Sequence, residues 1–268
     1  MRKKVWMWEF ILFFSLAVVL CGCGKTVTTT NDSGVSDDVL RGYKTIDGKL
    51  YRFDENGVSV EGLYEENGFY YLFEKNSSGK AAAVSSESRE VNGDTYYFSE
   101  SGKGFLSTQN PAVDKALGKF FSRNPMEKKA DKKEYLESCY RALLQECSYL
   151  GVGTPSFQHG WQFVQVKEML ERHRGNCFSY ATACGMIAHA LGFDVQIMTG
   201  KCKREGGRFG EHSWVLIDNR YVLDGVFEDV ANNGEGKLSF FWKDYESLEA
   251  DCDCEYKADK SWKAEMEG

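Results

Sequence analysis

Apolar and polar residues alternate with a period of two in the first third of the chain, which is typical of β-strands. Three stretches share one pattern, in which Asp-Gly or Asn-Gly is followed by Tyr three residues and Phe five residues after the glycine; they begin at Asp47, Asn67 and Asn92. Asp-Gly or Asn-Gly before such a strand favours a tight hairpin. Tyr and Phe two residues apart share a face that only neighbouring repeats can bury. We therefore predict stacked β-hairpins over residues 42–107.

Beyond residue 108 the apolar residues recur with the period of amphipathic helices. This pattern predicts helices over Ala112–Arg123, Lys132–Leu150, Trp161–Arg172 and Phe178–Leu191. The last of these is apolar almost all round, as expected of a central, buried helix. Alternation then returns and predicts strands over Phe193–Thr199, His212–Ile217, Tyr221–Asp224 and Lys237–Trp242, with a polar loop over Lys201–Gly210. The expected fold of residues 108–268 is α+β, with helices packed on an antiparallel sheet.

Residues 1–22 have the pattern of an export signal. Arg2, Lys3 and Lys4 precede an apolar run, Phe10–Leu20, that is too short for a comfortable membrane span. The following Leu20-Cys21-Gly22-Cys23 resembles a bacterial lipobox, which implies that Cys23 becomes the lipidated first residue. An ordinary secretory signal or an uncleaved anchor is the alternative. We expect residues 23–41 to be a flexible tether, and the protein to lie on the extracellular face of the bacterial membrane.

Composition and charge narrow the possible partners. The net charge of −7 gives no reason to expect nucleic acid as a partner, because nucleic acid binds to a basic face. Export permits disulfides, but the sequence leaves the pairing of the remaining cysteines open. Cys252-Asp-Cys254 lacks the spacing of a zinc ribbon, and we expect neither a metal nor another cofactor.

The start of the central helix carries the candidate chemistry. Asn176 is a good N-cap, so that Cys177 falls at the first helical position, where the helix dipole favours a thiolate. His212 opens a strand about 35 residues later, and Asp224 ends the next strand. A thiol becomes a nucleophile when a base takes its proton and a third group orients that base. Taken alone, Cys177 could equally be a buried structural thiol, as we expect Cys184 to be.

The remaining histidines fit the role of base less well. His159 lies in a predicted loop, His173 at a charged helix end, and His189 inside the buried helix. A histidine in such a helix is more often a satisfied core residue than a catalytic one.

The turn at Asp218-Asn219 decides whether Asp224 can reach His212. A strict two-residue turn would pair Asp224 with Ser213 and point it away from the face of His212. A three-residue turn or a bulge would place Asp224 opposite Trp214, diagonal to His212. We therefore predict a longer or bulged turn, with Asp229 or Glu228 as the reserve acid.

Cysteine, histidine and aspartate in this order resemble the transglutaminase-like superfamily. The resemblance rests on three short runs and covers about residues 160–230: Arg174-Gly-Asn-Cys177, His212-Ser-Trp-Val and Tyr221-Val-Leu-Asp224. It implies a transglutaminase-like (papain-like) fold, with Cys177 as nucleophile, His212 as base and later acid, and Asp224 as the group that orients the imidazole. Gly225 is a departure, since the family often has proline after this acid.

The resemblance also implies a reaction. Attack of Cys177 on a carboxamide or peptide carbonyl would give a thioester, which an amine resolves by transamidation or water by hydrolysis. Protein or peptidoglycan peptides are the expected substrates, on grounds of location alone. The backbone N–H of Cys177 is one natural oxyanion donor; Gln158, Trp161 and Gln162 remain open as the second.

Other interpretations stay open for both regions. The domain could be a non-catalytic binding or adhesion module, or a papain-like cell-wall endopeptidase of the NlpC type, which Phe178-Ser179 and Asp224 fit less well. The repeats resemble the cell-wall-binding repeats of surface proteins, which bind choline or glucan between hairpins. Those repeats usually begin with a tryptophan, and residues 42–107 contain none. Binding of a cell-wall polysaccharide and a role as a spacer are therefore both possible.

Overall fold

The computed structural model describes residues 40–127, 130–151, 153–203, 207–232, 240–248 and 255–264, and side chains only as far as residue 228 within the fourth range. The predicted export signal, Cys23, nearly all of the tether, Cys252 and Cys254 lie outside these ranges. Every described residue belongs to one compact unit, residues 39–268. Within the described residues, no helix combines the length and apolarity needed to cross a membrane.

The predicted hairpins are present. Asp47-Gly48, Asn67-Gly68 and Asn92-Gly93 each have positive φ at both residues, as type I′ turns require. They join β1 to β2, β3 to β4, and β6 to β7, and the strands run in the order β1-β2-β5-β4-β8-β7-β6, with β3 beside β4. The strands are β1 (Gly42–Ile46), β2 (Lys49–Phe53), β3 (Gly62–Glu66), β4 (Phe69–Lys75), β5 (Ala81–Ala83), β6 (Glu87–Val91), β7 (Asp94–Phe98) and β8 (Gly104–Leu106).

Several aromatic rings of the repeats face cations of the same chain. The Arg52 guanidinium lies over the Tyr64 ring, 4.4 Å from its centroid, and 5.9 Å from that of Tyr43. Lys132 lies 5.9 Å from the Tyr70 centroid and forms an ion pair with Glu65 at 3.2 Å. Such faces attract cations through the ring quadrupole, and here the protein itself supplies the cation.

The helical half of the structure follows the predicted pattern closely. Its helices are α1 (Pro111–Arg123), α2 (Lys132–Glu146), α3 (Trp161–Arg172), α4 (Cys177–Ala190) and α5 (Gly225–Asn232). Every residue of α4 except His189 is buried, so the all-round apolar sequence does mark the central helix. Helix α2 ends at Glu146 rather than Leu150, because Ser148 and Tyr149 form β9 (Ser148–Tyr149), which pairs in parallel with β10 (Arg174–Gly175) just before Cys177.

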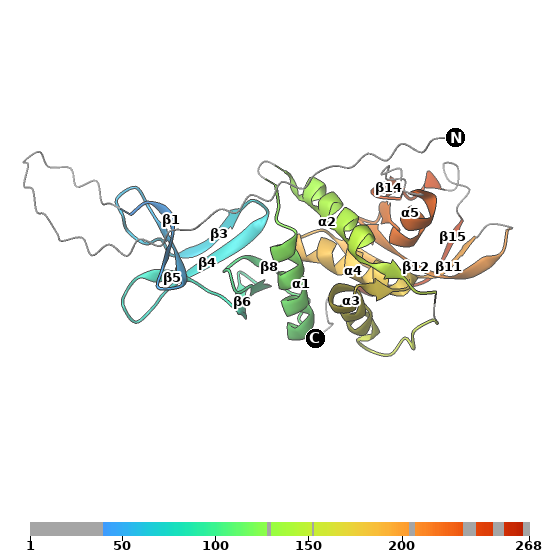
Figure 1. The fold of residues 1–268 in the computed structure, drawn as a ribbon, viewed down its shortest axis with the longest axis horizontal. Coiled ribbons are helices and arrows are strands. Elements are labelled where there is room, and N and C mark those ends of the chain that lie inside the picture. Colours follow the sequence, from blue (N-terminus) through green and yellow to red (C-terminus); the bar gives the residue numbers. More distant parts are fainter. Residues whose placement is uncertain are drawn as a thin grey trace, which may run out of the picture. The chain divides into compact units, whose positions relative to one another are not determined.

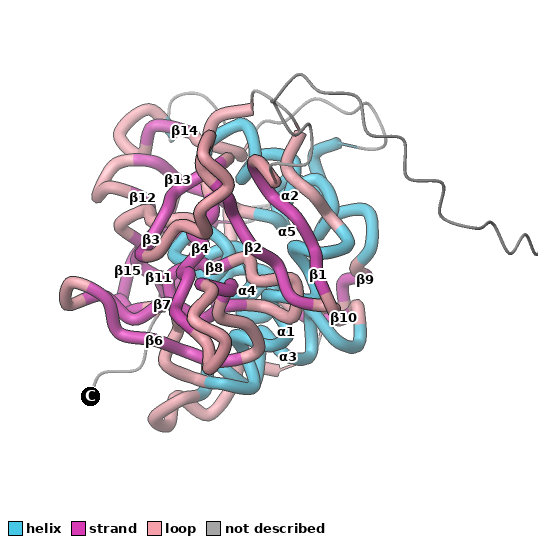
Figure 2. Tube along the Cα trace, turned by 90° about the vertical axis from the view of Figure 1, so that its left-hand side faces the viewer, coloured by secondary structure: helices cyan, strands magenta, loops and turns pink. Residues whose placement is uncertain are grey.

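A second sheet packs on α4. It has the order β14-β13-β12-β11-β15 and consists of β11 (Val195–Lys203), β12 (Phe209–Ile217), β13 (Tyr221–Leu223), β14 (Lys243–Asp244) and β15 (Tyr256–Lys263). Figure 1 shows α4 beside β12 and β11, and in Figure 2 the strands of this sheet lie mainly on the left and the helices mainly on the right. The predicted loop over Lys201–Gly210 is shorter than expected, because β11 and β12 extend into it.

The predicted strand over Lys237–Trp242 is wrong in its described part. Residues 240–242 form bends, and the short strand β14 starts only at Lys243. The backbone of Phe240 forms hydrogen bonds outside a β-ladder. Its N–H donates to the Glu228 carboxylate, and its carbonyl accepts from the Asp224 N–H.

The repeats and the helices share a hydrophobic core. Phe69 of β4 is buried with Phe121 of α1 and Tyr135 of α2, each 5.6 Å from it between ring centroids. The chain between the two regions is fixed by Asp114 of α1, which is itself buried and accepts hydrogen bonds from Ser107 and Thr108. Strand β4 of the repeats is therefore packed against α1 and α2, which share one hydrophobic core with α4.

Candidate active site

The first turn of α4 holds Cys177 in a defined position. The Asn176 side chain accepts the N–H groups of Phe178 and Ser179, and its amide donates to the Gly153 carbonyl at 2.8 Å. The Ser179 hydroxyl donates to Gln165 of α3 at 2.7 Å. Cys177 is thus the first helical residue, as predicted. Its own N–H lies outside the cap, among the helix-terminal donors that have no intrahelical acceptor.

His212 lies between Cys177 and Asp224. Its Nε2 is 2.5 Å from Asp224 Oδ2, and both side chains are almost completely buried. Cys177 also acts on the imidazole, because its interaction with the ring contributes to raising the pKa of His212. Because Nε2 is taken by Asp224, Nδ1 is the ring nitrogen that remains for the Cys177 sulfur. The structure brings all three predicted residues together.

The turn between β12 and β13 has three residues, as the prediction required. Ile217 pairs with Tyr221, so that Asp218, Asn219 and Arg220 form the turn, and the Arg220 N–H donates to the Ile217 carbonyl. This register continues to place Asp224 opposite Trp214, diagonal to His212. The prediction of a longer turn is confirmed.

Asp224 also begins a helix that the sequence pattern did not predict. Its Oδ1 accepts the N–H groups of Val226 and Phe227, each at 3.1 Å, at the start of α5. A carboxylate in this capping position is fixed in orientation and favoured by the helix dipole. Of the reserve acids, Glu228 turns to the Phe240 N–H at 2.6 Å, and the side chain of Asp229 lies outside the described residues. Asp224 is the acid that meets His212.

Together, the charges and hydrogen bonds of its neighbours raise the pKa of His212 by more than burial lowers it. Burial by itself lowers the pKa of His212, while the charge and hydrogen bond of Asp224, and then those of Cys177, raise it to about 9. The rings of Phe227, Tyr256 and Trp214 lie 4.8, 6.1 and 6.2 Å from the imidazole and cover it. His212 therefore carries a positive charge at neutral pH, beside the sulfur of Cys177.

Sequence reasoning missed Tyr256. Its hydroxyl donates to Asp224 Oδ2 at 2.8 Å, from β15 at the edge of the sheet. The strand lies in a polar, charged segment that gave no clear alternation, so its position in the sheet could be found only in three dimensions.

Two candidates for the second oxyanion donor, Gln162 and Trp161, differ in their hydrogen bonding. The Gln162 amide donates to the Lys263 carbonyl at 3.5 Å. Within the described residues, the buried indole Nε1 of Trp161 has no hydrogen-bond partner. The Trp161 ring lies 6.1 Å from that of Phe178, the neighbour of Cys177.

The other described thiols have different surroundings. Cys139 and Cys147 form no disulfide, and burial raises the pKa of each thiol to about 12. Burial raises the pKa of the Cys184 thiol as well. Over the described ranges, no cluster of histidine, cysteine and acidic residues could hold a metal ion.

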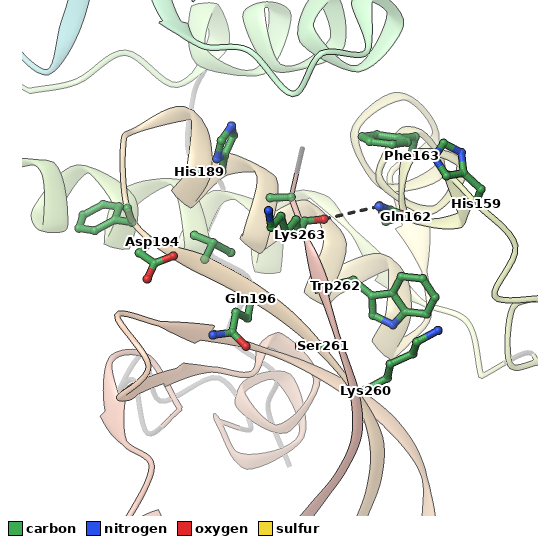
Figure 3. Close-up of a pocket in the computed structure, with 14 residues that line it drawn as sticks. His159, Gln162, Phe163, His189, Asp194, Gln196, Lys260, Ser261, Trp262 and Lys263 are labelled. Carbon is green, nitrogen blue, oxygen red and sulfur yellow. Dashed lines mark hydrogen bonds between the residues drawn. The ribbon is translucent and has the colours of Figure 1, made fainter. Parts of the chain in front are cut away.

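A cavity of about 810 Å³ lies between the start of α3, the end of α4 and the end of β15. Figure 3 shows Trp262 and Lys260 on one side of it and His189 on another, with the Gln162–Lys263 hydrogen bond across it. The Trp262 ring contacts those of Trp161 and Phe157, which in turn contact Phe178. Cys177 and His212 do not line this cavity.

Comparisons with known proteins cover both regions. No curated protein matches the chain. Among solved structures, the choline-binding domain of a Streptococcus pneumoniae protein matches with 26% identity over 25% of this chain and 97% of its own, at a TM-score of 0.22. Choline-binding protein F of the same organism matches with 25% identity over 24% of this chain and 20% of its own, at a TM-score of 0.20.

A candidate cysteine protease from Cytophaga hutchinsonii has 17% identity over 59% of this chain and 51% of its own, at a TM-score of 0.32. The model of the transglutaminase-like superfamily matches residues 119–222, which include Cys177 and His212. These residues, from within α1 to β13, therefore form a transglutaminase-like domain.

Proposed function

We propose that this domain is a cysteine acyltransferase or hydrolase that acts on amide or peptide bonds through a thioester at Cys177. The observation that carries the proposal is the position of the His212 imidazole between Cys177 and the Asp224 carboxylate. A protonated imidazole beside sulfur stabilises a thiolate, and a buried carboxylate keeps that imidazole charged and oriented.

Each group then has one role in the reaction. The thiolate of Cys177 attacks the carbonyl carbon, and the electron pair of the carbonyl moves to its oxygen. When the carbonyl re-forms, the C–N bond breaks and the imidazolium of His212 gives its Nδ1 proton to the departing nitrogen. Neutral His212 next takes a proton from an amine or a water molecule, which attacks the thioester and releases the thiolate.

We assign the oxyanion to two donors. One is the N–H of Cys177, which the Asn176 cap leaves outside its bonds. The other is the indole N–H of Trp161, a buried donor without a described partner, since such a donor is costly unless it gains an acceptor during function. Trp161 packs on Phe178, which places it at the correct end of α4.

The setting of the enzyme is part of the proposal. The lipobox-like run ending at Cys23 supports a lipid anchor on the outer face of the membrane, and the acidic body gives no reason to expect nucleic acid. Substrates would then be surface proteins or peptidoglycan peptides. The hairpin repeats would bind cell-wall polysaccharide or act as a spacer.

Alkylation of Cys177 across pH tests the central claim. An ordinary thiol, with a pKa near 8.5, is mostly protonated at pH 6 to 7 and reacts slowly with iodoacetamide. We expect Cys177 to be alkylated selectively in this range, as measured by peptide mapping, and His212→Ala to abolish the selectivity. Cys184 of the same helix is the internal control, because it is equally buried and burial raises the pKa of its thiol.

The outcome separates the interpretations. If Cys177 reacts no faster than Cys184, or reacts only above pH 8, the catalytic proposal fails and a binding module becomes the better explanation. If Cys177 is activated, incubation with peptides and a fluorescent primary amine distinguishes the fates of the thioester. Incorporation of the amine indicates transamidation, and cleavage without incorporation indicates hydrolysis.

A further inference from the structure

Both oxygens of the Asp224 carboxylate are engaged. Oδ1 accepts the two backbone N–H groups at the start of α5, and Oδ2 accepts His212 Nε2. Oδ2 also accepts the Tyr256 hydroxyl at 2.8 Å. The histidine and the tyrosine therefore share one oxygen atom.

The surrounding sheet holds Tyr256 in place. Its ring lies 4.7 Å from that of Trp214 and 6.0 Å from that of Phe227, and Tyr256 pairs with Cys202 of β11. The close approach of β15 requires Gly200, where a Cβ atom would clash with the Lys257 carbonyl; the β11–β15 register shifts at the same place. A glycine and a bulge thus bring the strand to the site.

We propose that Tyr256 is a positioning residue for the reaction proposed above: its hydroxyl fixes the Asp224 carboxylate and competes with His212 for Oδ2. This role rests on the proposed function. Tyr256 and Asp224 both lie beyond the stretch that matches the family model, which ends at residue 222. Through the hydrogen bond between Tyr256 and Asp224, the C-terminal strand β15 also belongs to the active site.

The competition has a definite direction. A hydroxyl that donates to a carboxylate disperses part of its negative charge, and this weakens the attraction of the carboxylate for the imidazolium proton. The interaction helps His212 to release that proton to the departing nitrogen. The ionisable groups that act on His212 are Cys177 from α4 and Asp224, with Tyr256 bonded to the latter from β15.

Two further ionisable groups, Glu228 and Tyr140, lie near Asp224. Glu228 of α5 is buried beside Tyr140 of α2, whose hydroxyl donates to it at 3.5 Å. Burial, followed by the charges of Cys184, Glu228 and Asp224, raises the pKa of Tyr140, so that this hydroxyl stays neutral.

The test compares Tyr256→Phe with Tyr245→Phe in the full-length chain, kept soluble in detergent. The first change removes the hydroxyl and keeps the ring. The second removes the hydroxyl of Tyr245, a partly buried tyrosine whose pKa is also raised by burial. The Tyr245 ring lies 6.4 Å from that of Tyr256, and its hydroxyl is not one of the groups described above as bonded to Asp224. NMR titration of ¹⁵N-labelled histidine gives the pKa of His212 directly. We expect Y256F to raise it by about half to one unit and Y245F to leave it unchanged.

A chemical readout accompanies the titration. Iodoacetate is anionic and reacts faster than neutral iodoacetamide only while the imidazolium is present, so the ratio of the two rates falls as His212 loses its proton. The pH of that fall should shift upward with the NMR value. If Y256F does not fold, 3-fluorotyrosine at position 256 replaces it; its more acidic hydroxyl donates more strongly and should lower the pKa of His212.

An unchanged or a lowered pKa in Y256F, or an equal rise in Y245F, would overturn the inference. A raised pKa in a chain whose Cys177 is unreactive would contradict the proposed function while supporting the coupling between Tyr256 and His212. The two ideas therefore fail separately.

Discussion

Replacement of Phe69 by alanine should destabilise the transglutaminase-like domain, although Phe69 lies in the repeats. The ring is 2% exposed and makes edge-on contacts with Phe121 of α1 and Tyr135 of α2. Removing a buried phenylalanine costs about 3–5 kcal/mol, because the lost burial is joined by the cost of the cavity. For a unit of this size, each kcal/mol shifts the melting temperature by about 2–4 °C, so we expect a fall of about 10 °C.

Tryptophan fluorescence is the appropriate assay, since residues 42–107 contain no tryptophan and the tryptophans of the described residues all lie within residues 161–262. The matched control is Phe98→Ala, an equally buried ring whose cluster lies wholly within the repeats. If both halves unfold together, both variants lower the same fluorescence midpoint. If F98A leaves that midpoint unchanged, the halves unfold separately. If F69A also leaves it unchanged, the shared core does not stabilise the domain and the reasoning is refuted.

Three further predictions concern charge and hydrogen bonding. Asp224→Asn removes the charge that raises the pKa of His212 to about 9, so that the imidazolium is lost at lower pH. Iodoacetamide labelling of Cys177 at pH 6 to 7 should then slow about tenfold or more. An unchanged rate would contradict the role of the acid. Arg52→Ala removes the guanidinium that lies over the rings of Tyr64 and Tyr43. Calorimetry should then detect binding of tetramethylammonium with a dissociation constant on the order of 1 mM, which the wild type does not show. If the variant binds no tetramethylammonium, these rings form no cation site. Trp161→Phe removes the proposed oxyanion donor and should slow acylation by p-nitrophenyl acetate about 100-fold. The rate of alkylation should not change, because alkylation forms no oxyanion. If the variant and the wild type are acylated at the same rate, Trp161 is not the donor.

Local signals explain why much of the helical half could be predicted from the sequence. Helix α4 was identified from its apolar residues and from Asn176, because capping and burial leave their mark on adjacent positions. The placement of Asp224 was predictable for a different reason: a strand has a period of two, so the requirement that Asp224 face His212 fixed the parity of the turn.

The features that were missed depend on distant partners. Helix α5 starts with glycine and is capped by an acid that sequence reasoning had assigned to the preceding strand. Tyr256 reaches Asp224 only because β15 pairs with β11, across more than 50 residues of sequence. The segment β9 ended a predicted helix early, since its partner β10 lies 26 residues further on. Pairing of this kind leaves no periodic signal in either segment.

The three-residue turn between β12 and β13 makes the active site sensitive to chain length. Substitutions that accept the positive φ of Asp218 and Asn219 leave the register alone, whereas deletion or insertion of one residue would exchange the two faces of β13 and carry Asp224 away from His212. During divergence, the residues of this turn can therefore drift while their number cannot. A reading-frame-preserving loss of a single codon at Asn219 would inactivate the site as effectively as loss of the acid itself.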